Sequence, residues 1–171
     1  QLTYSINKDD KKDGAYNVKD LSTKSLWLKG AYKGGERSGN WYAYNDKKMQ
    51  LCYNYDQRKL LFIDSNLLTK ADVKVITPDK EIAEKARIPL LICPVNLYLT
   101  MLCRNIALPS DVFKQGKADV KIKAKIDETG KAEYFVIYED KTGTKEMPVS
   151  YKPASDFSFE WIPARYEQKN L

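Results

Sequence analysis

The chain has 171 residues, of which 43% are hydrophobic and 30% are charged, enough for one or two folded domains with buried cores. Its net charge is +6 at pH 7, but lysines and acidic residues are interspersed, so we interpret the excess as an ordinary solvated surface rather than a nucleic-acid-binding footprint. Histidine is absent, which excludes the catalytic triads, metal sites and proton shuttles that need imidazole.

Cysteine and carboxylate chemistry shows no catalytic or metal-binding pattern either. Cys52, Cys93 and Cys103 lack metal-ligand spacing, and we interpret them as buried free thiols, with a bridge from Cys52 to either other cysteine left open for an oxidising compartment. Carboxylates are scattered, so no pair is assigned to one site. The sequence therefore predicts no catalytic residue, metal or cofactor.

Two features bear on the compartment. The longest apolar segment, Ile88–Cys103, is interrupted by Pro94 and Asn96, so we expect no membrane span in this chain. The chain begins at Gln1 rather than methionine, as a processed or a trimmed chain would, and removal of a signal peptide would be consistent with an envelope location.

Along the chain, residues 1–13 are polar and are predicted to form a loose arm. A degenerate repeat follows, in which Gly14–Tyr16 corresponds to Gly39–Trp41 and Gly30–Lys33 corresponds to Tyr53–Asp56. Each repeat unit is expected to be one pair of strands joined by a turn.

The segment Gly30–Tyr44 resembles the MORN-like repeats of YwqK-type proteins, in which a tyrosine strand, a Gly-rich turn and a Gly-x-Trp strand alternate. Gly34 and Gly35 supply the turn, and aromatic side chains supply the apolar area of a thin sheet. These aromatics form either the core of the sheet or a platform that stacks against sugar rings or peptides. The candidate aromatic face consists of Trp41, Tyr42, Tyr44, Tyr53 and Tyr55.

The apolar segment Leu60–Leu68 ends the repeat, and we place the domain boundary there, giving a β repeat module at 1–65 and a second module at 66–171. The second module begins with a predicted short strand at Asp72–Ile76 and a helix at 77–87. A second helix is predicted from Asn96 to about residue 106.

The clearest pattern in the chain is a hairpin within Gly116–Tyr138. From Val120 to Ile126 apolar residues alternate with lysines, as in a strand with one buried face and one solvated face. Asp127–Gly130 supplies the turn, and Ala132–Tyr138 supplies a second strand rich in aromatic and β-branched residues.

This part of the chain resembles the C-terminal domain of TonB-type energy transducers, from about Ile88 to the C-terminus. The motifs that carry the resemblance are Asn105–Pro109, Val112–Lys117, Ile126–Lys131 and Trp161–Tyr166. The resemblance implies an α+β domain with helices packed on an antiparallel sheet. It departs from the family at Glu146–Phe159, where two prolines leave room for only a short, interrupted helix.

The resemblance also implies a function. We expect a non-enzymatic binding or scaffold module of a bacterial periplasm or cell envelope, which meets a protein or peptide by β-augmentation at Phe157–Gln168. The first alternative is carbohydrate or cell-wall binding on the aromatic face, and the second is a carboxylate- or cysteine-dependent enzyme. The candidate partner-binding residues are Phe157, Phe159, Trp161, Ile162 and Tyr166.

Overall fold

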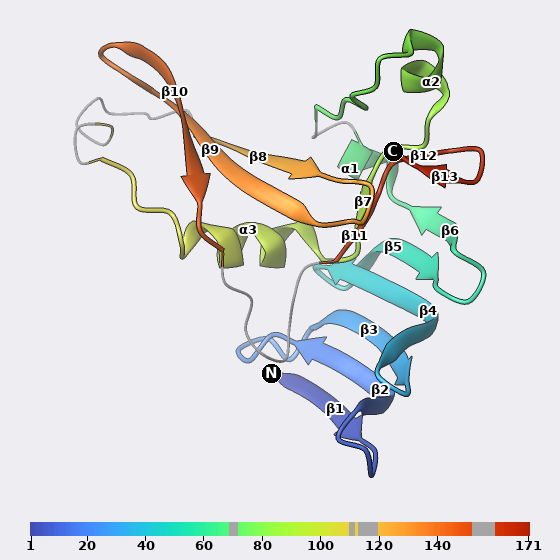
Figure 1. The fold of residues 1–171 in the computed structure, drawn as a ribbon. Coiled ribbons are helices and arrows are strands. Elements are labelled where there is room, and N and C mark those ends of the chain that lie inside the picture. The colour runs from blue at the N-terminus through green and yellow to red at the C-terminus, as the bar shows by residue number, and fades with distance from the viewer. Residues whose placement is uncertain (69–71, 110–111, 113–119, 152–159) are drawn as a thin grey trace. The chain divides into compact units, whose positions relative to one another are not determined.

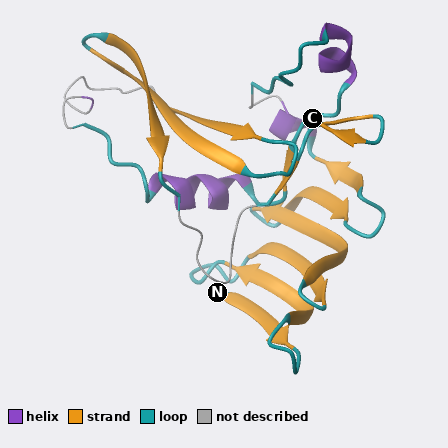
Figure 2. Ribbon diagram, in the orientation of Figure 1, coloured by secondary structure: helices purple, strands orange, loops and turns teal. Residues whose placement is uncertain are grey.

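The computed structural model describes residues 1–68, 72–109, 112, 120–151 and 160–171. The chain is mainly antiparallel β-structure with a minor helical content, as the predominance of strands in Figure 2 shows. It divides into two compact units, one formed by 1–73 with 91–98 and the other by 74–90 with 99–171. The predicted module boundary after residue 65 stays a prediction.

The first unit contains a six-stranded meander in which each strand pairs antiparallel with the next along the chain (Figure 1). The expected aromatic-rich antiparallel sheet is therefore confirmed. The prediction of a loose arm at 1–13 is wrong, because this segment forms the first strand and the start of the second. Tyr4 on the first strand lies opposite Tyr16 on the second. The strands are β1 (Leu2–Ile6), β2 (Lys12–Lys19), β3 (Leu26–Lys33), β4 (Glu36–Asn45), β5 (Lys48–Asn54) and β6 (Lys59–Ile63).

One face of this sheet carries a row of apolar residues that crosses every strand in register. Each member lies directly opposite the next, and the central members Leu28, Ala43 and Leu51 are buried. Cross-strand apolar pairs of this kind are the unit of sheet stabilisation. The row consists of Leu2, Val18, Leu28, Ala43, Leu51 and Ile63.

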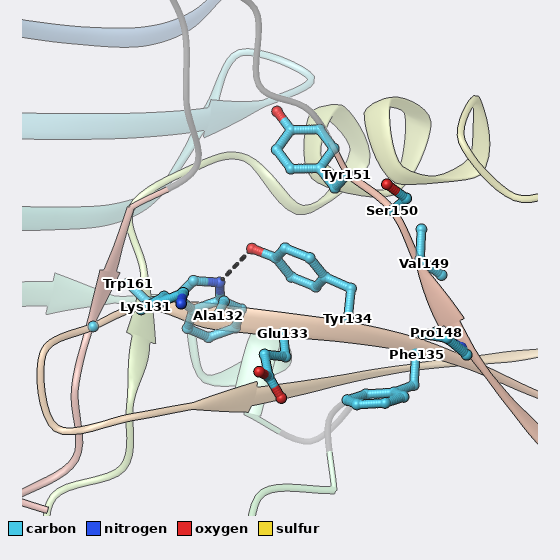
Figure 3. A pocket seen from close by; sticks show the side chains of 11 residues that line it. Lys131, Ala132, Glu133, Tyr134, Phe135, Pro148, Val149, Ser150, Tyr151 and Trp161 are labelled. Atoms are coloured by element: carbon cyan, nitrogen blue, oxygen red, sulfur yellow. Dashed lines mark hydrogen bonds between the residues drawn. The ribbon is translucent and has the colours of Figure 1, made fainter.

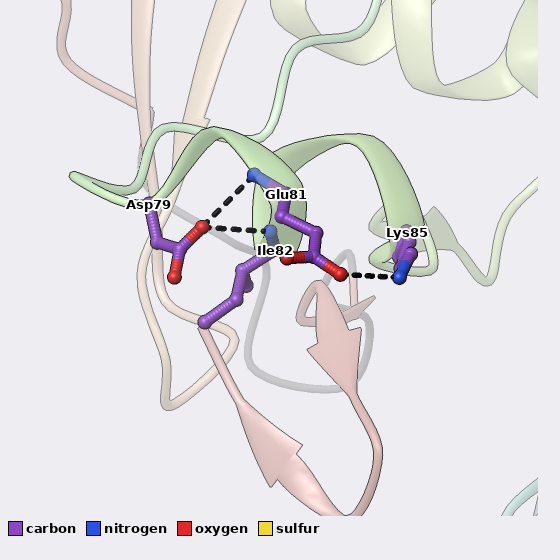
Figure 4. A network of polar contacts seen from close by, with 4 residues as sticks. All are labelled: Asp79, Glu81, Ile82 and Lys85. Atoms are coloured by element: carbon purple, nitrogen blue, oxygen red, sulfur yellow. Dashed lines mark hydrogen bonds and ion pairs between the residues drawn. The ribbon is translucent and has the colours of Figure 1, made fainter.

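Three short helices have bounds within the described ranges: α1 (Ser65–Leu68), α2 (Lys80–Lys85) and α3 (Val95–Cys103). The helix predicted at 77–87 is present but shorter, while the strand predicted at 72–76 is absent from the structure. α2 begins at Asp79, whose Oδ1 accepts hydrogen bonds from the backbone N–H groups of Glu81 and Ile82 (Figure 4). Lys85 then pairs with Glu81 one turn away on the exposed surface.

The second unit holds a three-stranded antiparallel sheet, in the order β10-β9-β8. The predicted hairpin is confirmed as β8 (Lys121–Ile126) and β9 (Ala132–Asp140). The interrupted helix expected from residue 146 is wrong for the part that the structure describes, because β10 (Gly143–Val149) pairs with β9 along its whole length. Two further short strand pairs are β7 (Leu90–Leu91) with β11 (Trp161–Ile162), and β12 (Arg165–Tyr166) with β13 (Lys169–Asn170).

Candidate functional site

The β8–β9 hairpin is held in register by its turn. Asp127 Oδ1 accepts hydrogen bonds from the backbone N–H groups of Thr129 and Lys131, each at 2.9 Å. The hydrogen bond from the Thr129 hydroxyl is the main cause that lowers the pKa of Asp127, so the carboxylate stays ionised in its capping role. Gly130 takes the positive φ of 85° that this turn requires.

The register decides which backbone groups of β8 face its partner and which face outward. Asp127 N donates to Lys131 O at 3.0 Å, which makes these two residues a hydrogen-bonded pair at the base of the hairpin. Hydrogen-bonded and non-hydrogen-bonded pairs alternate along an antiparallel ladder. The three lysines of β8 therefore direct their backbone groups to β9, whereas Ile122, Ala124 and Ile126 direct theirs to the outer edge.

The two edges of this sheet are not equivalent. Since Lys123 and Phe135 form a hydrogen-bonded pair, the residues next to Phe135 on β9 point their backbone groups toward β10. Pro148 lies opposite Phe135 and is therefore at an outward-facing position of β10, where a proline breaks no ladder hydrogen bond. The β10 edge thus lacks a donor near its C-terminal end, while β8 keeps its outward donors.

No strand within the described ranges pairs with the outer edge of β8, which makes this edge the candidate functional site. Its outward-facing groups are the backbone N–H and C=O of Ile122, Ala124 and Ile126. Sequence reasoning identified the hairpin but not this edge. The Asp140–Gly143 turn chemistry ahead of Pro148 is the signal that could have revealed β10, and with it which edges of the sheet remain open.

The residues predicted to form the partner-binding edge have other pairings where the structure describes them. Trp161 and Ile162 form β11 against β7, and Tyr166 belongs to the β12–β13 pair. Arg165 exchanges two backbone hydrogen bonds with Arg87, at 2.7 and 3.0 Å. Phe157 and Phe159, and with them the start of the predicted edge, lie outside the described residues.

Trp161 also forms one wall of an open cleft of about 690 Å³ beside the start of β9 (Figure 3). Its indole Nε1 donates to the hydroxyl of Tyr134 at 3.1 Å, and the ring of Tyr151 meets that of Tyr134 edge-on. A Cβ built on Gly130 would lie 2.5 Å from the carbonyl oxygen of Trp161, so glycine allows this close approach. Trp161 is thus held at this cleft from two sides, by Tyr134 at its indole and by Gly130 at its backbone.

In the first unit, the predicted aromatic face separates onto both sides of the sheet. Trp41 is fully buried, Tyr53 is 4% exposed, and Tyr55 meets the Trp41 ring edge-on at 5.8 Å. Tyr32 meets Trp41 at 5.3 Å and 87°, and the guanidinium of Arg37 lies 4.1 Å from the Trp41 ring centre. Trp41, Tyr53 and Tyr55 therefore belong to an aromatic cluster on the apolar face, with a cation stacked on it.

Tyr42 and Tyr44 lie on the opposite face of the sheet and are half-buried. Their rings are 6.4 Å apart with an interplanar angle of 27°, so the two rings present similar orientations. Asn40 Nδ2 donates to the Tyr42 hydroxyl at 3.2 Å, and Asn54 Nδ2 donates to Asn40 Oδ1. Two tyrosine rings and a chain of side-chain amides thus share one surface.

The cysteines are all free. Burial raises the pKa of both the Cys52 and the Cys93 thiols, which keeps them protonated rather than as the thiolates that nucleophilic chemistry needs. The expectation of buried thiols is confirmed for these two and is wrong for Cys103, which is exposed at the end of α3.

Two further findings concern the residues that the structure describes. No group of three or more Cys, Asp or Glu side chains there is arranged to hold a metal ion. No helix there is both long and apolar enough to cross a membrane.

Comparison with known proteins finds no matching family model, no significantly similar curated protein and no significantly similar solved structure.

Proposed function

We propose that this chain is a non-enzymatic protein-binding or scaffold module of a bacterial cell envelope, which holds an extended peptide by adding it as a strand to β8. The observation that carries the proposal is the outward row of backbone groups at Ile122, Ala124 and Ile126, on an edge that no described strand covers. Strand addition obtains affinity from such main-chain groups and selectivity from alternate side chains.

The motifs that resemble a TonB-type C-terminal domain support the same class of function, because that resemblance implies partner recognition at a sheet edge and helices that accompany the sheet. The pairings of Trp161, Ile162 and Tyr166 move the proposed edge from Phe157–Gln168 to β8. The periplasmic or envelope location belongs to the proposal, and it rests on the resemblance alone.

The proposal is tested by selecting heptapeptides from a random display library with three forms of the protein: wild type, Ala124→Pro and Ala124→Ser. Proline removes one outward N–H of β8 but keeps every N–H that bonds to β9, whereas serine keeps the outward N–H as well. Peptides selected by the wild type should bind the serine variant and lose binding to the proline variant.

Amide hydrogen exchange supplies a second readout. Peptide binding should slow exchange at Ile122, Ala124 and Ile126 and leave exchange at the lysines of β8 nearly unchanged, because the lysine amides already bond to β9. Selected peptides that bind Ala124→Pro as tightly as wild type, with no protection at the three edge amides, would refute strand addition at β8.

A second candidate function is carbohydrate or cell-wall binding on the face of Tyr42 and Tyr44. The half-exposed, similarly oriented rings and the neighbouring amide of Asn40 favour it, since sugar rings stack on aromatics and bond to amides. Tyr42→Ala with Tyr44→Ala should abolish sedimentation with purified cell-wall polymer, and Tyr55→Phe, on the other face, should not. Equal sedimentation of all three proteins would exclude this face.

A further inference from the structure

The side chains of β8 restrict what can pair with its open edge. Lys121, Lys123 and Lys125 share one face of the strand, and Ile122, Ala124 and Ile126 share the other. A strand added beside β8 must therefore present one set of alternate side chains to a row of ammonium groups and the other set to an apolar row.

We propose that the partner is an extended acidic peptide in which carboxylate and apolar side chains alternate; this inference rests on the proposed function. Opposite charges placed directly across two strands are favourable, and like charges are unfavourable. A peptide with this alternation satisfies both rows at once while its backbone completes the outward hydrogen bonds of β8.

The protein already places acidic groups beside two of these lysines on their inner side. Lys125 lies opposite Glu133 on β9, and Lys123 Nζ is 2.9 Å from Glu146 Oε2 on β10. Lys125 Nζ also lies 4.5 Å from the ring centre of Phe135. No described strand pairs with the outer side of β8, so carboxylates of an added strand would extend the same pattern outward.

A second copy of this chain is a poor occupant of the same edge. Pairing β8 with β8 places one lysine row against another, and like charges directly opposite each other destabilise a strand pair. The β10 edge of a second copy has Pro148 at an outward position, which removes a donor. The charge and donor pattern thus selects an acidic partner of different sequence.

The test uses three fluorescein-labelled heptapeptides that alternate valine with glutamate, glutamine or lysine, titrated with the full chain by fluorescence anisotropy. The glutamate peptide should bind most tightly and the lysine peptide least. Three cross-strand charge pairs correspond to about 3-fold to 150-fold tighter binding of the glutamate than of the glutamine peptide. The combined variant Lys121→Glu, Lys123→Glu and Lys125→Glu should reverse the order, and raised salt should reduce the preference.

The outcomes separate this inference from the proposed function. If the glutamate and lysine peptides bind equally well to wild type and Ala124→Pro abolishes both, strand addition stands and the acidic preference is overturned. If wild type binds none of the three peptides, the acidic partner is overturned, and it is also overturned if light scattering shows a dimer that Ala124→Pro abolishes. The display selection still tests the edge in both cases.

Should Ala124→Pro fail to fold, N-methylation of the glutamate peptide replaces it. Methyl groups on the alternate residues whose N–H groups face β8 should abolish binding, whereas methyl groups on the other residues should not. Equal binding of both methylated peptides overturns recognition through the edge.

Discussion

Among the glycines of the first unit, Gly30 is the position where one added methyl group should lower the free energy of unfolding most. A Cβ at residue 30 would lie 2.3 Å from Cδ2 and from Cε2 of Trp41, far inside the roughly 3.5–4.0 Å of an ordinary carbon contact. The indole has little freedom to move, because it is fully buried, its Nε1 donates to Ala31 O at 3.1 Å, and Tyr32 meets it edge-on at 5.3 Å.

The expected cost of Gly30→Ala follows from opposing terms. Overpacking of a core site costs about 1–3 kcal/mol. Displacing the indole also costs its hydrogen bond, about 0.5–1.5 kcal/mol. Alanine offsets about 0.4–1 kcal/mol, since it restricts the unfolded chain. We therefore expect a net loss of about 0.5–4 kcal/mol in the free energy of unfolding, measured by guanidinium unfolding with far-UV circular dichroism and with near-UV dichroism to report on tryptophan.

Trp41→Ala provides the matched background, because it removes the three atoms that lie nearest the new Cβ. In that background Gly30→Ala should become neutral or stabilising by up to about 1 kcal/mol. An unchanged unfolding midpoint and near-UV spectrum in Gly30→Ala, or an equal cost in both backgrounds, would show that contact with Trp41 does not exclude a side chain at residue 30.

Two further predictions concern local hydrogen bonds. Asp79→Ala should destabilise α2 by about 0.5–2 kcal/mol because it removes the N-cap, and the loss should appear as faster amide exchange at Ile82. The control Glu81→Gln, which changes only an exposed ion pair, should alter that exchange far less. Equal effects of the two substitutions would contradict the capping role. The Ser22 hydroxyl, with backbone amides of its turn, lowers the pKa of Asp20 to about 2, so the stabilisation from its ionised form is present above the ordinary carboxyl pKa and is lost as pH falls toward 2. Carbon-detected NMR titration should show this midpoint, and Asp20→Asn should remove that pH dependence; a midpoint near 4 would contradict it.

Local patterns predicted the parts of the fold whose cause is local. The alternation of lysines with apolar residues and the Asp127–Gly130 turn are sufficient for the β8–β9 hairpin, because strand periodicity and turn chemistry act within a few residues. The correspondence of Gly14–Tyr16 with Gly39–Trp41 is also seen in the structure, where both glycines have positive φ and both aromatic side chains are buried on one face.

Features that depend on distant pairing were not predictable in this way. The polar segment 1–13 contributes to strands because Tyr4 pairs with Tyr16 across β1 and β2. The composition of the segment does not predict this cross-strand pair. Alternation placed Tyr42 and Trp41 on opposite faces, but only the assembled sheet decides which of the two is buried.

The candidate site shows the same division. The sequence alone determined that β8 has one lysine face and one apolar face, since side-chain direction alternates along any strand. Only the tertiary structure decided that β10 pairs with the other side of β9, with Pro148 at an outward position, and that β8 is therefore an edge with outward donors. Whether a backbone group is available to a partner depends on which strands lie beside it, and that is a property of the assembled sheet rather than of any one segment.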